Sequence, residues 1–201
     1  KEAFYSIIAG SILIIEGEHG TGKTKVLKEV IKKFGGEGRV AYINCKEMQR
    51  ELNVEDVITK KNGILGFLFK KYPKNMILLL DDVEFLSVKN VERIKYFYDS
   101  NHLKSVVITT KNYENLKFND SFKQRIRHLV KMKPISEFEA LQVIRDKLGD
   151  NILSDRVIKE TYKLSGKNMK KFLENCETIC KIYVQNRNLN EDDVKRVLGV
   201  R

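Results

Sequence analysis

The sequence contains no tryptophan, only two prolines and only three cysteines among its 201 residues. Glycine is also modest, at 12 residues, while hydrophobic residues make up 42% and charged residues 32% of the chain. This balance excludes collagenous, low-complexity and disordered chains. The length allows one compact domain with at most a small appendage, so a large multidomain enzyme is excluded as well.

Long hydrophobic runs are also missing from the sequence. The longest runs, at residues 11–15 and 76–80, fall far short of the roughly 18 apolar residues that span a bilayer. No basic stretch followed by an apolar one opens the chain, as a secretory leader would require. We therefore expect a protein that neither crosses a membrane nor is a secreted precursor.

The three cysteines, Cys45, Cys176 and Cys180, are odd in number and form no Cys-x-x-Cys motif. This usage fits buried thiols in a reducing compartment, so we expect a cytoplasmic protein. Cys176 and Cys180 would share one face of a helix, where a pair of metal ligands is conceivable. Core packing is the preferred interpretation, because no histidine or third cysteine lies nearby in the sequence.

Acidic residues are outnumbered by basic ones. Lysine and arginine total 38 against 27 for aspartate and glutamate, which gives a formal net charge of +11. Such an excess favours a polyanionic partner, either nucleic acid or an acidic membrane face. A highly charged surface that is merely solvated is the alternative.

Short apolar runs alternate with stretches of helical period in the first two thirds of the chain. The runs at 76–80 and 105–110 are apolar with little interruption, as strands buried on both faces require. This alternation predicts a doubly wound parallel α/β sheet. The expected strands are residues 11–16, 39–44, 76–80, 105–110 and 128–132, and the expected helices among them include 23–34 and about 90–100.

The pattern changes after Pro134, where only helical period remains. Ser136 and Glu139 form a capping-box sequence, which typically opens a helix. The sequence therefore predicts two domains, an α/β domain over residues 1–134 and a small α-helical lid over residues 135–201. The four expected lid helices are residues 136–147, 154–164, 168–185 and 190–198.

The most specific motif is Gly-Glu-His-Gly-Thr-Gly-Lys-Thr at residues 17–24, a Walker A pattern between an expected strand and an expected helix. Its glycines allow backbone N–H groups to surround phosphates, and the helix N-terminus adds its dipole. Lys23 would place its charge on the β- and γ-phosphates, and the Thr24 hydroxyl would bind Mg²⁺. A chance glycine-rich turn would not match all fixed positions and both flanking elements. The expected nucleotide-binding residues here are Gly17, Gly20, Thr21, Gly22, Lys23 and Thr24.

Asp81 and Asp82 directly follow the apolar run at residues 76–80, as in a Walker B strand. Asp81 would hold Mg²⁺, and Asp82 would orient the attacking water. Paired carboxylates can simply begin a turn, but their position about sixty residues after the Walker A motif favours the Walker B interpretation. Because aspartate is shorter than glutamate, Asp82 predicts slow hydrolysis and makes a nucleotide-switch role credible.

The order of these motifs resembles the AAA+ ATPases. The Walker A motif is followed by Leu-Leu-Leu-Asp-Asp-Val-Glu-Phe-Leu at residues 78–86, by Val-Val-Ile-Thr-Thr at 106–110, and then by a basic segment and the lid. Residues 81–86 and 166–173 (Gly-Lys-Asn-Met-Lys-Lys-Phe-Leu) resemble the bacterial DnaA initiators and related helicase loaders. Ala-Tyr-Ile-Asn-Cys at 41–45 is similar to archaeal and eukaryotic origin-recognition ATPases. The resemblance implies a P-loop NTPase (AAA+) fold with a five-stranded parallel sheet and a C-terminal helical lid.

The resemblance also implies three further site residues. Thr110 would be the sensor 1 group near the γ-phosphate, although the family often has asparagine where this chain has Lys111. Arg125 would be an arginine finger that reaches the nucleotide of a neighbouring subunit, with Arg127 as the second choice. The alternative is that both are ordinary surface arginines. Lys170 matches the sensor 2 position, where lysine keeps the charge of the usual arginine but loses its planar fork.

A group of lysines between the second and third strands lies near the position of DNA-contacting insertions in initiators. These lysines could neutralise phosphates without reading sequence, or they could form a solvated face. No base-reading motif is recognisable, so any DNA binding by this chain is expected to lack strong sequence preference. The lysines are Lys60, Lys61, Lys70, Lys71 and Lys74.

Three classes of function follow from these residues. The first is an ATP- and Mg²⁺-dependent ATPase that assembles on DNA, with copies of itself or a related AAA+ subunit, as a replication initiator or helicase loader. The second is an AAA+ ATPase that regulates or remodels a protein partner. The third is a small-molecule P-loop kinase. This hypothesis is the weakest, because a kinase needs a phosphoacceptor pocket, whereas the last third of this chain is expected to form a sensor 2-type lid.

Overall fold

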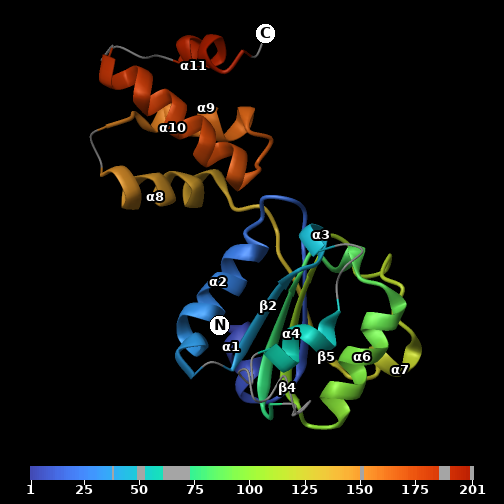
Figure 1. The fold of residues 1–201 in the computed structure, drawn as a ribbon. Coiled ribbons are helices and arrows are strands. Elements are labelled where there is room, and N and C mark those ends of the chain that lie inside the picture. Colours follow the sequence, from blue (N-terminus) through green and yellow to red (C-terminus); the bar gives the residue numbers. More distant parts are fainter. Residues whose placement is uncertain (38, 49–52, 61–72, 150–151, 186–190, 200–201) are drawn as a thin grey trace. The chain divides into compact units, whose positions relative to one another are not determined.

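A computed structural model describes residues 1–37, 39–48, 53–60, 73–149, 152–185 and 191–199. The chain forms two compact units, coloured along the sequence in Figure 1. The first unit comprises Lys1–Gly17 and Lys23–Met132, and the second comprises Glu18–Gly22 and Lys133–Arg201. Among the described residues, no helix has the length and hydrophobicity needed to cross a bilayer.

The first unit is built on five parallel strands, which confirms the predicted fold class. Their order across the sheet is β2-β3-β4-β1-β5, so β1, which precedes the Walker A motif, lies inside the sheet. Each strand begins and ends within two residues of its predicted bounds. The strands are β1 (Ile12–Glu16), β2 (Val40–Asn44), β3 (Met76–Asp81), β4 (Leu103–Thr110) and β5 (Ile126–Lys131).

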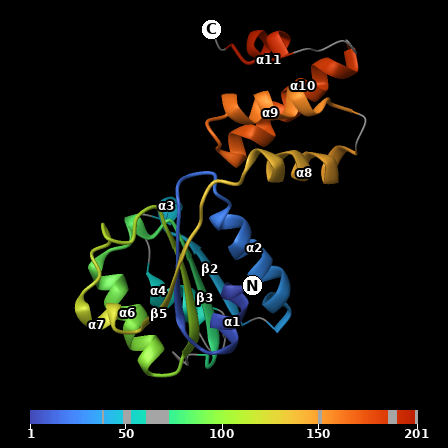
Figure 2. The same ribbon diagram turned by 180° about the vertical axis from the view of Figure 1, so that it is seen from behind.

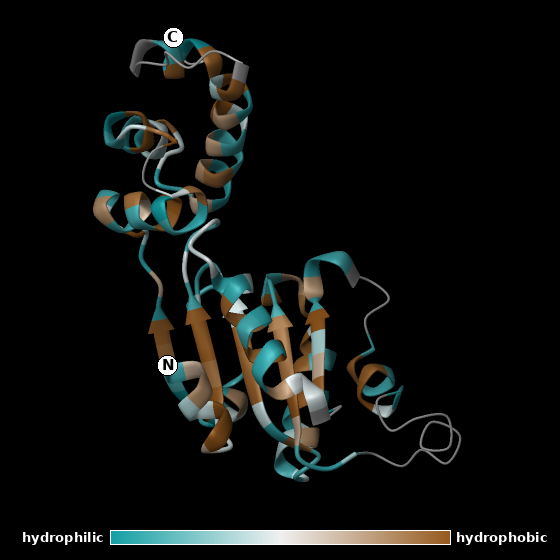
Figure 3. Cartoon of the chain, turned by 90° about the vertical axis from the view of Figure 1, so that its left-hand side faces the viewer, coloured by the Kyte–Doolittle hydropathy of each residue, from teal (hydrophilic) through white to brown (hydrophobic). Residues whose placement is uncertain are grey.

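Both faces of this sheet are covered by helices, as Figures 1 and 2 show. Alternate residues of β1 explain why: Ile12 and Ile14 belong to one buried cluster, and Leu13 and Ile15 belong to another. Figure 3 shows the resulting hydrophobic strands. The covering helices are α1 (Glu2–Ile8), α2 (Lys23–Phe34), α3 (Cys45–Met48), α4 (Val54–Lys60), α6 (Val88–Asp99) and α7 (Asp120–Lys123), with 3-10 turns η1 (Gly35–Glu37) and η2 (Val83–Phe85).

Helix α1 was not predicted from the sequence. It has only seven residues, so its own propensity is a weak signal, and an isolated helix of this length is unstable in water. Buried Ala3 and Ile7 hold it against the sheet, in the same cluster as Leu13 and Ile15. Tertiary packing therefore stabilises this helix.

The second unit contains α8 (Glu137–Leu148), α9 (Asp155–Leu164), α10 (Met169–Gln185) and α11 (Glu191–Val197). The capping box at the start of α8 forms as predicted, with Ser136 and Glu139 each bonding to the other's backbone N–H. The core of this unit includes Tyr162 and Phe172, whose rings meet edge to face with centroids 5.1 Å apart. Cys176 is buried in the same cluster. In the described part of this unit, the four helices thus share one hydrophobic core.

Candidate functional site

The parallel register brings the ends of four strands to one edge of the sheet. Asp81 at the end of β3 lies beside Asn44 of β2, and Glu16 at the end of β1 lies beside Thr110 of β4. The backbone N–H of Gly17 donates to Thr110 O at 3.1 Å, which fixes the start of the Walker A loop. The carboxyl edge of a parallel sheet is where such folds hold their ligands.

Asp81 is the centre of a hydrogen-bond network within the first unit. The residue is 2% exposed, and its carboxylate accepts hydrogen bonds from three hydroxyl groups. Thr24 Oγ1 donates to Asp81 Oδ2 at 2.8 Å, Tyr42 OH donates to the same oxygen at 3.1 Å, and Thr109 Oγ1 donates to Oδ1. The structure therefore joins the Walker A threonine and the first Walker B carboxylate, 57 residues apart in the sequence.

Lys23 opens helix α2 and is itself 6% exposed. Its Nζ donates to Gly17 O at 2.5 Å, so the ammonium lies against the start of its own loop. The backbone of the loop is bent by two glycines with positive φ, Gly20 at 82° and Gly22 at 96°. Such φ values are unfavourable for other residues, which explains why glycine occupies both positions.

Within the second unit, the start of α10 contacts the loop segment Glu18–Gly22. Asn168 Nδ2 donates to His19 O at 3.1 Å, and Met169 N donates to Gly20 O at 3.2 Å. A Cβ added to Gly20 would lie 2.1 Å from Asn168 Oδ1, so the contact itself requires glycine. Sequence analysis did not identify Asn168, whose Oδ1 also accepts from Lys171 N and caps α10.

The second Walker B carboxylate and the sensor 1 candidate do not bond to each other. Asp82 has a positive φ of 53°, and its backbone N–H donates to Thr109 Oγ1 at 3.1 Å. Thr110 Oγ1 donates instead to Glu84 Oε1 at 2.7 Å, and Lys111 N donates to the same oxygen. Glu84 was therefore missed as a site residue. Glu84 lies in a 3-10 turn three residues after Asp81, and only the folded structure shows that this turn brings it to Thr110.

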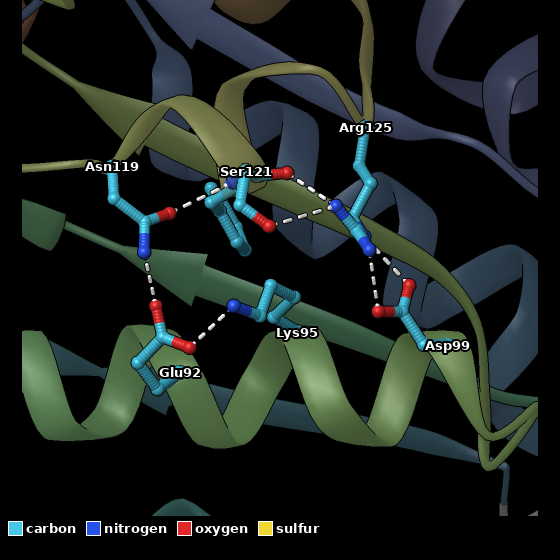
Figure 4. Close-up of polar contacts among 7 residues, drawn as sticks. Glu92, Lys95, Asp99, Asn119, Ser121 and Arg125 are labelled. Carbon is cyan, nitrogen blue, oxygen red and sulfur yellow. Dashed lines mark hydrogen bonds and ion pairs between the residues drawn. The ribbon is translucent and has the colours of Figure 1, made fainter.

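The two candidate arginine fingers differ in their surroundings. Arg125 forms a bidentate ion pair with Asp99, with Nε–Oδ1 at 2.6 Å and Nη2–Oδ2 at 2.7 Å, and its Nη1 donates to Ser121 O and Oγ (Figure 4). The Asp99 carboxylate raises the pKa of Arg125 further above its usual value. Arg127 is exposed on β5, which is an edge strand. The sequence alone could not separate these two residues.

Lys170 lies in the first turn of α10, and its side chain is 81% exposed. Its Nζ is 4.0 Å from Glu174 Oε1, an ion pair one helical turn along. Of the predicted DNA-contacting lysines, Lys60 and Lys74 are exposed. The other three, Lys61, Lys70 and Lys71, lie outside the described residues.

Two ionisable groups near Asp81 are kept neutral by their surroundings. Burial, with the adjacent carboxylate of Asp81, raises the pKa of Tyr42, so the phenol remains a hydrogen-bond donor. Burial likewise raises the pKa of the Cys45 thiol to about 12, with smaller contributions from Asp81 and Asp82. Tyr42 thus adds a third neutral donor that sequence analysis had not assigned to the site.

The three thiols are expected to react at different rates in the native protein. Burial raises the pKa of both Cys45 and Cys176 to about 12, which lowers the thiolate fraction at pH 8 about thousandfold relative to an ordinary thiol. Cys180 is only partly buried and should react first with an aromatic disulfide reagent. In denaturant all three should react at similar rates. Rapid labelling of Cys45 in the native protein would contradict this burial.

Comparison with known proteins gives consistent matches. Residues 9–141 match the family model described as an AAA domain. A chromosomal replication initiator protein DnaA of Clavibacter sepedonicus is 30% identical over 106 residues, or 49% of this chain and 21% of the initiator. Orc1 of Aeropyrum pernix, solved in complex with DNA, has a TM-score of 0.77 at 15% identity over 98% of this chain and 63% of Orc1. A RuvB variant of Thermotoga maritima has a TM-score of 0.75 at 12% identity, over 98% of this chain and 67% of RuvB.

These matches extend over only part of the relatives. The region shared with the DnaA initiator is about a fifth of that protein, and the chain spans about two thirds of the Orc1 and RuvB chains. The TM-scores to the solved structures show a common fold, and at 12–15% identity they show the fold alone. The fold, the motif order and the initiator match agree with the resemblance deduced from the sequence.

Proposed function

The chain belongs to the AAA domain family, and on that premise we propose that it binds ATP with Mg²⁺, hydrolyses it slowly and assembles on DNA as a replication initiator or helicase loader. The observation that carries the nucleotide part is the 2.8 Å hydrogen bond between Thr24 and Asp81. It places the Walker A hydroxyl and the Walker B carboxylate together at the carboxyl edge of the sheet.

The oxygen atoms at this edge fit a magnesium site. Mg²⁺ prefers carboxylate and other oxygen ligands. Thr24 provides a hydroxyl and Asp81 a carboxylate, and the two are hydrogen-bonded to each other. Thr24 and Asp81 would hold the ion, which when bound would neutralise charge on the β- and γ-phosphates. Tyr42 and Thr109 would orient the Asp81 carboxylate through their hydrogen bonds.

The Walker A residues and Lys170 would bind the phosphates in this proposal. Lys23 would give its ammonium to the β- and γ-phosphate oxygens, and the loop residues Gly17, Gly20, Thr21 and Gly22 would surround them with backbone N–H groups. Lys170 would add a second positive charge from the lid.

Asp82 would orient the attacking water, and Thr110 would act as sensor 1 through its hydroxyl. Glu84 accepts a hydrogen bond from Thr110 and would hold the sensor 1 hydroxyl in place. In this proposal, the short Asp82 side chain, on a backbone with positive φ, would make hydrolysis slow.

The DNA part of the proposal rests on charge and on the relatives. The chain carries a net charge of +11, its DnaA relative is named a chromosomal replication initiator, and the Orc1 neighbour was solved with DNA. Lysines such as Lys60 and Lys74 would bind phosphates without reading bases.

DNA binding is expected to be weak, insensitive to sequence and strongly dependent on salt. If about four phosphates are neutralised, log affinity should fall with log salt at a slope of roughly −3.6 for duplex DNA. Replacing four lysines of the segment by alanine should flatten this slope. Fluorescence anisotropy with labelled duplex at two salt concentrations measures it. The four replaced residues are Lys60, Lys61, Lys70 and Lys71.

A matched control separates a DNA-contacting face from net charge. Alanine at four exposed lysines of the helical unit removes the same charge and should leave the slope nearly unchanged. Equal flattening by both variants would count against a specific basic face. The control residues are Lys159, Lys163, Lys171 and Lys181.

The same titration decides between the initiator and a second candidate, an AAA+ ATPase that remodels or regulates a protein partner. Both candidates are AAA+ ATPases, so the fold alone favours neither. ATP should strengthen DNA binding if nucleotide assembles several subunits on one duplex, because linked sites gain avidity. Undetectable binding at low salt with ATP, ADP and no nucleotide would favour the protein-remodelling function.

A further inference from the structure

The first unit contains a cavity at the opposite end of the sheet from the Walker motifs. Its volume is about 480 Å³, and it lies between α1, the end of α2 and the starts of β2, β3 and β4. Figures 1 and 2 show α1 beside the end of α2. Lys104, near the start of β4, lines the cavity, whereas Thr110 ends the same strand about 20 Å away at 3.3 Å per residue. One nucleotide could not occupy both places.

Three basic side chains from separate elements meet at this cavity. Lys33 comes from the last turn of α2, Arg39 from the residue before β2, and Lys104 from β4. All three are exposed to solvent, and the nine described residues that line the cavity include no acidic side chain. Lys33 Nζ lies 4.5 Å from the ring centroid of Phe4, a cation–π contact that restricts where this charge can lie.

Apart from Asn75 and Gly36, the rest of the wall is apolar. Ile7 and Ile77 are buried, at 1% and 7% exposure, and Phe34 packs against the same core cluster. The cavity therefore combines a largely hydrophobic wall with three positive charges. Its volume falls within the range of roughly 300–1,000 Å³ that is usual for small-ligand sites.

We propose that this cavity binds an organic phosphate, that is, a phosphate group carried on a planar or apolar body. A phosphomonoester carries about −1.5 to −2 charges near neutral pH, which matches a cluster of three cations better than a single carboxylate does. Lys33 and Lys104 supply point charges for the phosphate oxygens, and Arg39 adds its positive charge at the same cavity. Ile7, Phe34 and Ile77 would contact the organic body. The phosphate can come from a free nucleotide-like molecule or from a nucleic-acid strand.

The proposal does not depend on ATP binding at the Walker motifs, and a calorimetric titration with phenyl phosphate tests it directly. The probe should bind the 201-residue protein saturably at low salt and bind a Lys23→Ala variant equally well, because Lys23 belongs to the other site. Lys33→Glu and Lys104→Glu should each weaken binding by about tenfold or more, since each reverses a charge at the phosphate. Inorganic phosphate should bind more weakly than phenyl phosphate, because it lacks the apolar body.

Lys32→Glu is the matched control, because Lys32 is exposed in the same turn of α2 but does not line the cavity. It should change the affinity by less than about twofold. An equal effect of Lys32→Glu and Lys33→Glu would overturn the proposal, as would the lack of saturable binding to the parent protein. Competition by a thymidine oligonucleotide in the parent, lost in Lys33→Glu, would support a nucleic-acid source. Phenyl phosphate binding without such competition would support a small organic phosphate.

Discussion

Replacing Lys23 by alanine is expected to weaken ATP binding by about 100-fold, which would make it undetectable in most titrations. Hydrogen bonds to charged groups contribute roughly 1.5–3 kcal/mol each, and this ammonium is the main positive charge that the Walker A motif offers to the phosphates. The residue is 6% exposed, so its charge is poorly screened by solvent. A titration with a fluorescent ATP analogue in the presence of Mg²⁺ measures the loss.

Lys25→Ala provides the control for this variant. Lys25 is exposed in the first turn of the same helix, so its removal changes the net charge equally without touching the loop. We expect unchanged affinity for this variant and unchanged circular dichroism for both. If Lys23→Ala bound the analogue as tightly as the parent protein does, the assignment of the nucleotide site would be wrong.

Hydrolysis is expected to rise with protein concentration, because a neighbouring subunit would supply the arginine finger. Such fingers accelerate GTP hydrolysis by roughly 10³–10⁵, which is an upper guide for this chain. Of the two candidates, Arg127 is exposed on edge strand β5, while Arg125 is bound to Asp99 and Ser121. We therefore expect Arg127→Ala to remove most of the concentration-dependent rate and to leave the basal rate of dilute protein unchanged. Steady-state ATPase assays over a hundredfold range of protein concentration measure both rates.

Arg125→Ala should behave differently from Arg127→Ala. Its guanidinium joins α6 to the segment after α7, so its loss should lower the melting temperature, and Asp99→Asn should lower it in the same direction. Arg127→Ala should leave the melting temperature unchanged. The opposite pattern, in which Arg125→Ala abolishes the concentration-dependent rate at unchanged stability, would show that the Asp99 ion pair opens on assembly and that Arg125 is the finger.

The strands and most helices were readable from the sequence because their signals are local. Continuous apolar runs predicted β3 and β4, and the capping box predicted the start of α8. The Walker A motif was equally clear, because phosphate binding requires glycines, a lysine and a hydroxyl at fixed spacing on one short segment. Helix α1 was missed, because its seven residues are stabilised by packing of Ala3 and Ile7 and not by any signal of their own.

The sequence by itself determined the parallel α/β class, the helical C-terminal segment and the identity of the phosphate-binding loop. Only the tertiary structure decided that Tyr42 and Thr109 surround Asp81, that Glu84 bonds to Thr110, and that Arg125 is paired with Asp99. These contacts join residues 26 to 39 positions apart. Their physical reason is tertiary packing. The order of strands in the sheet brings strand ends together through backbone hydrogen bonds, and helix α6 packs beside α7, and neither arrangement can be read from the local pattern of side chains.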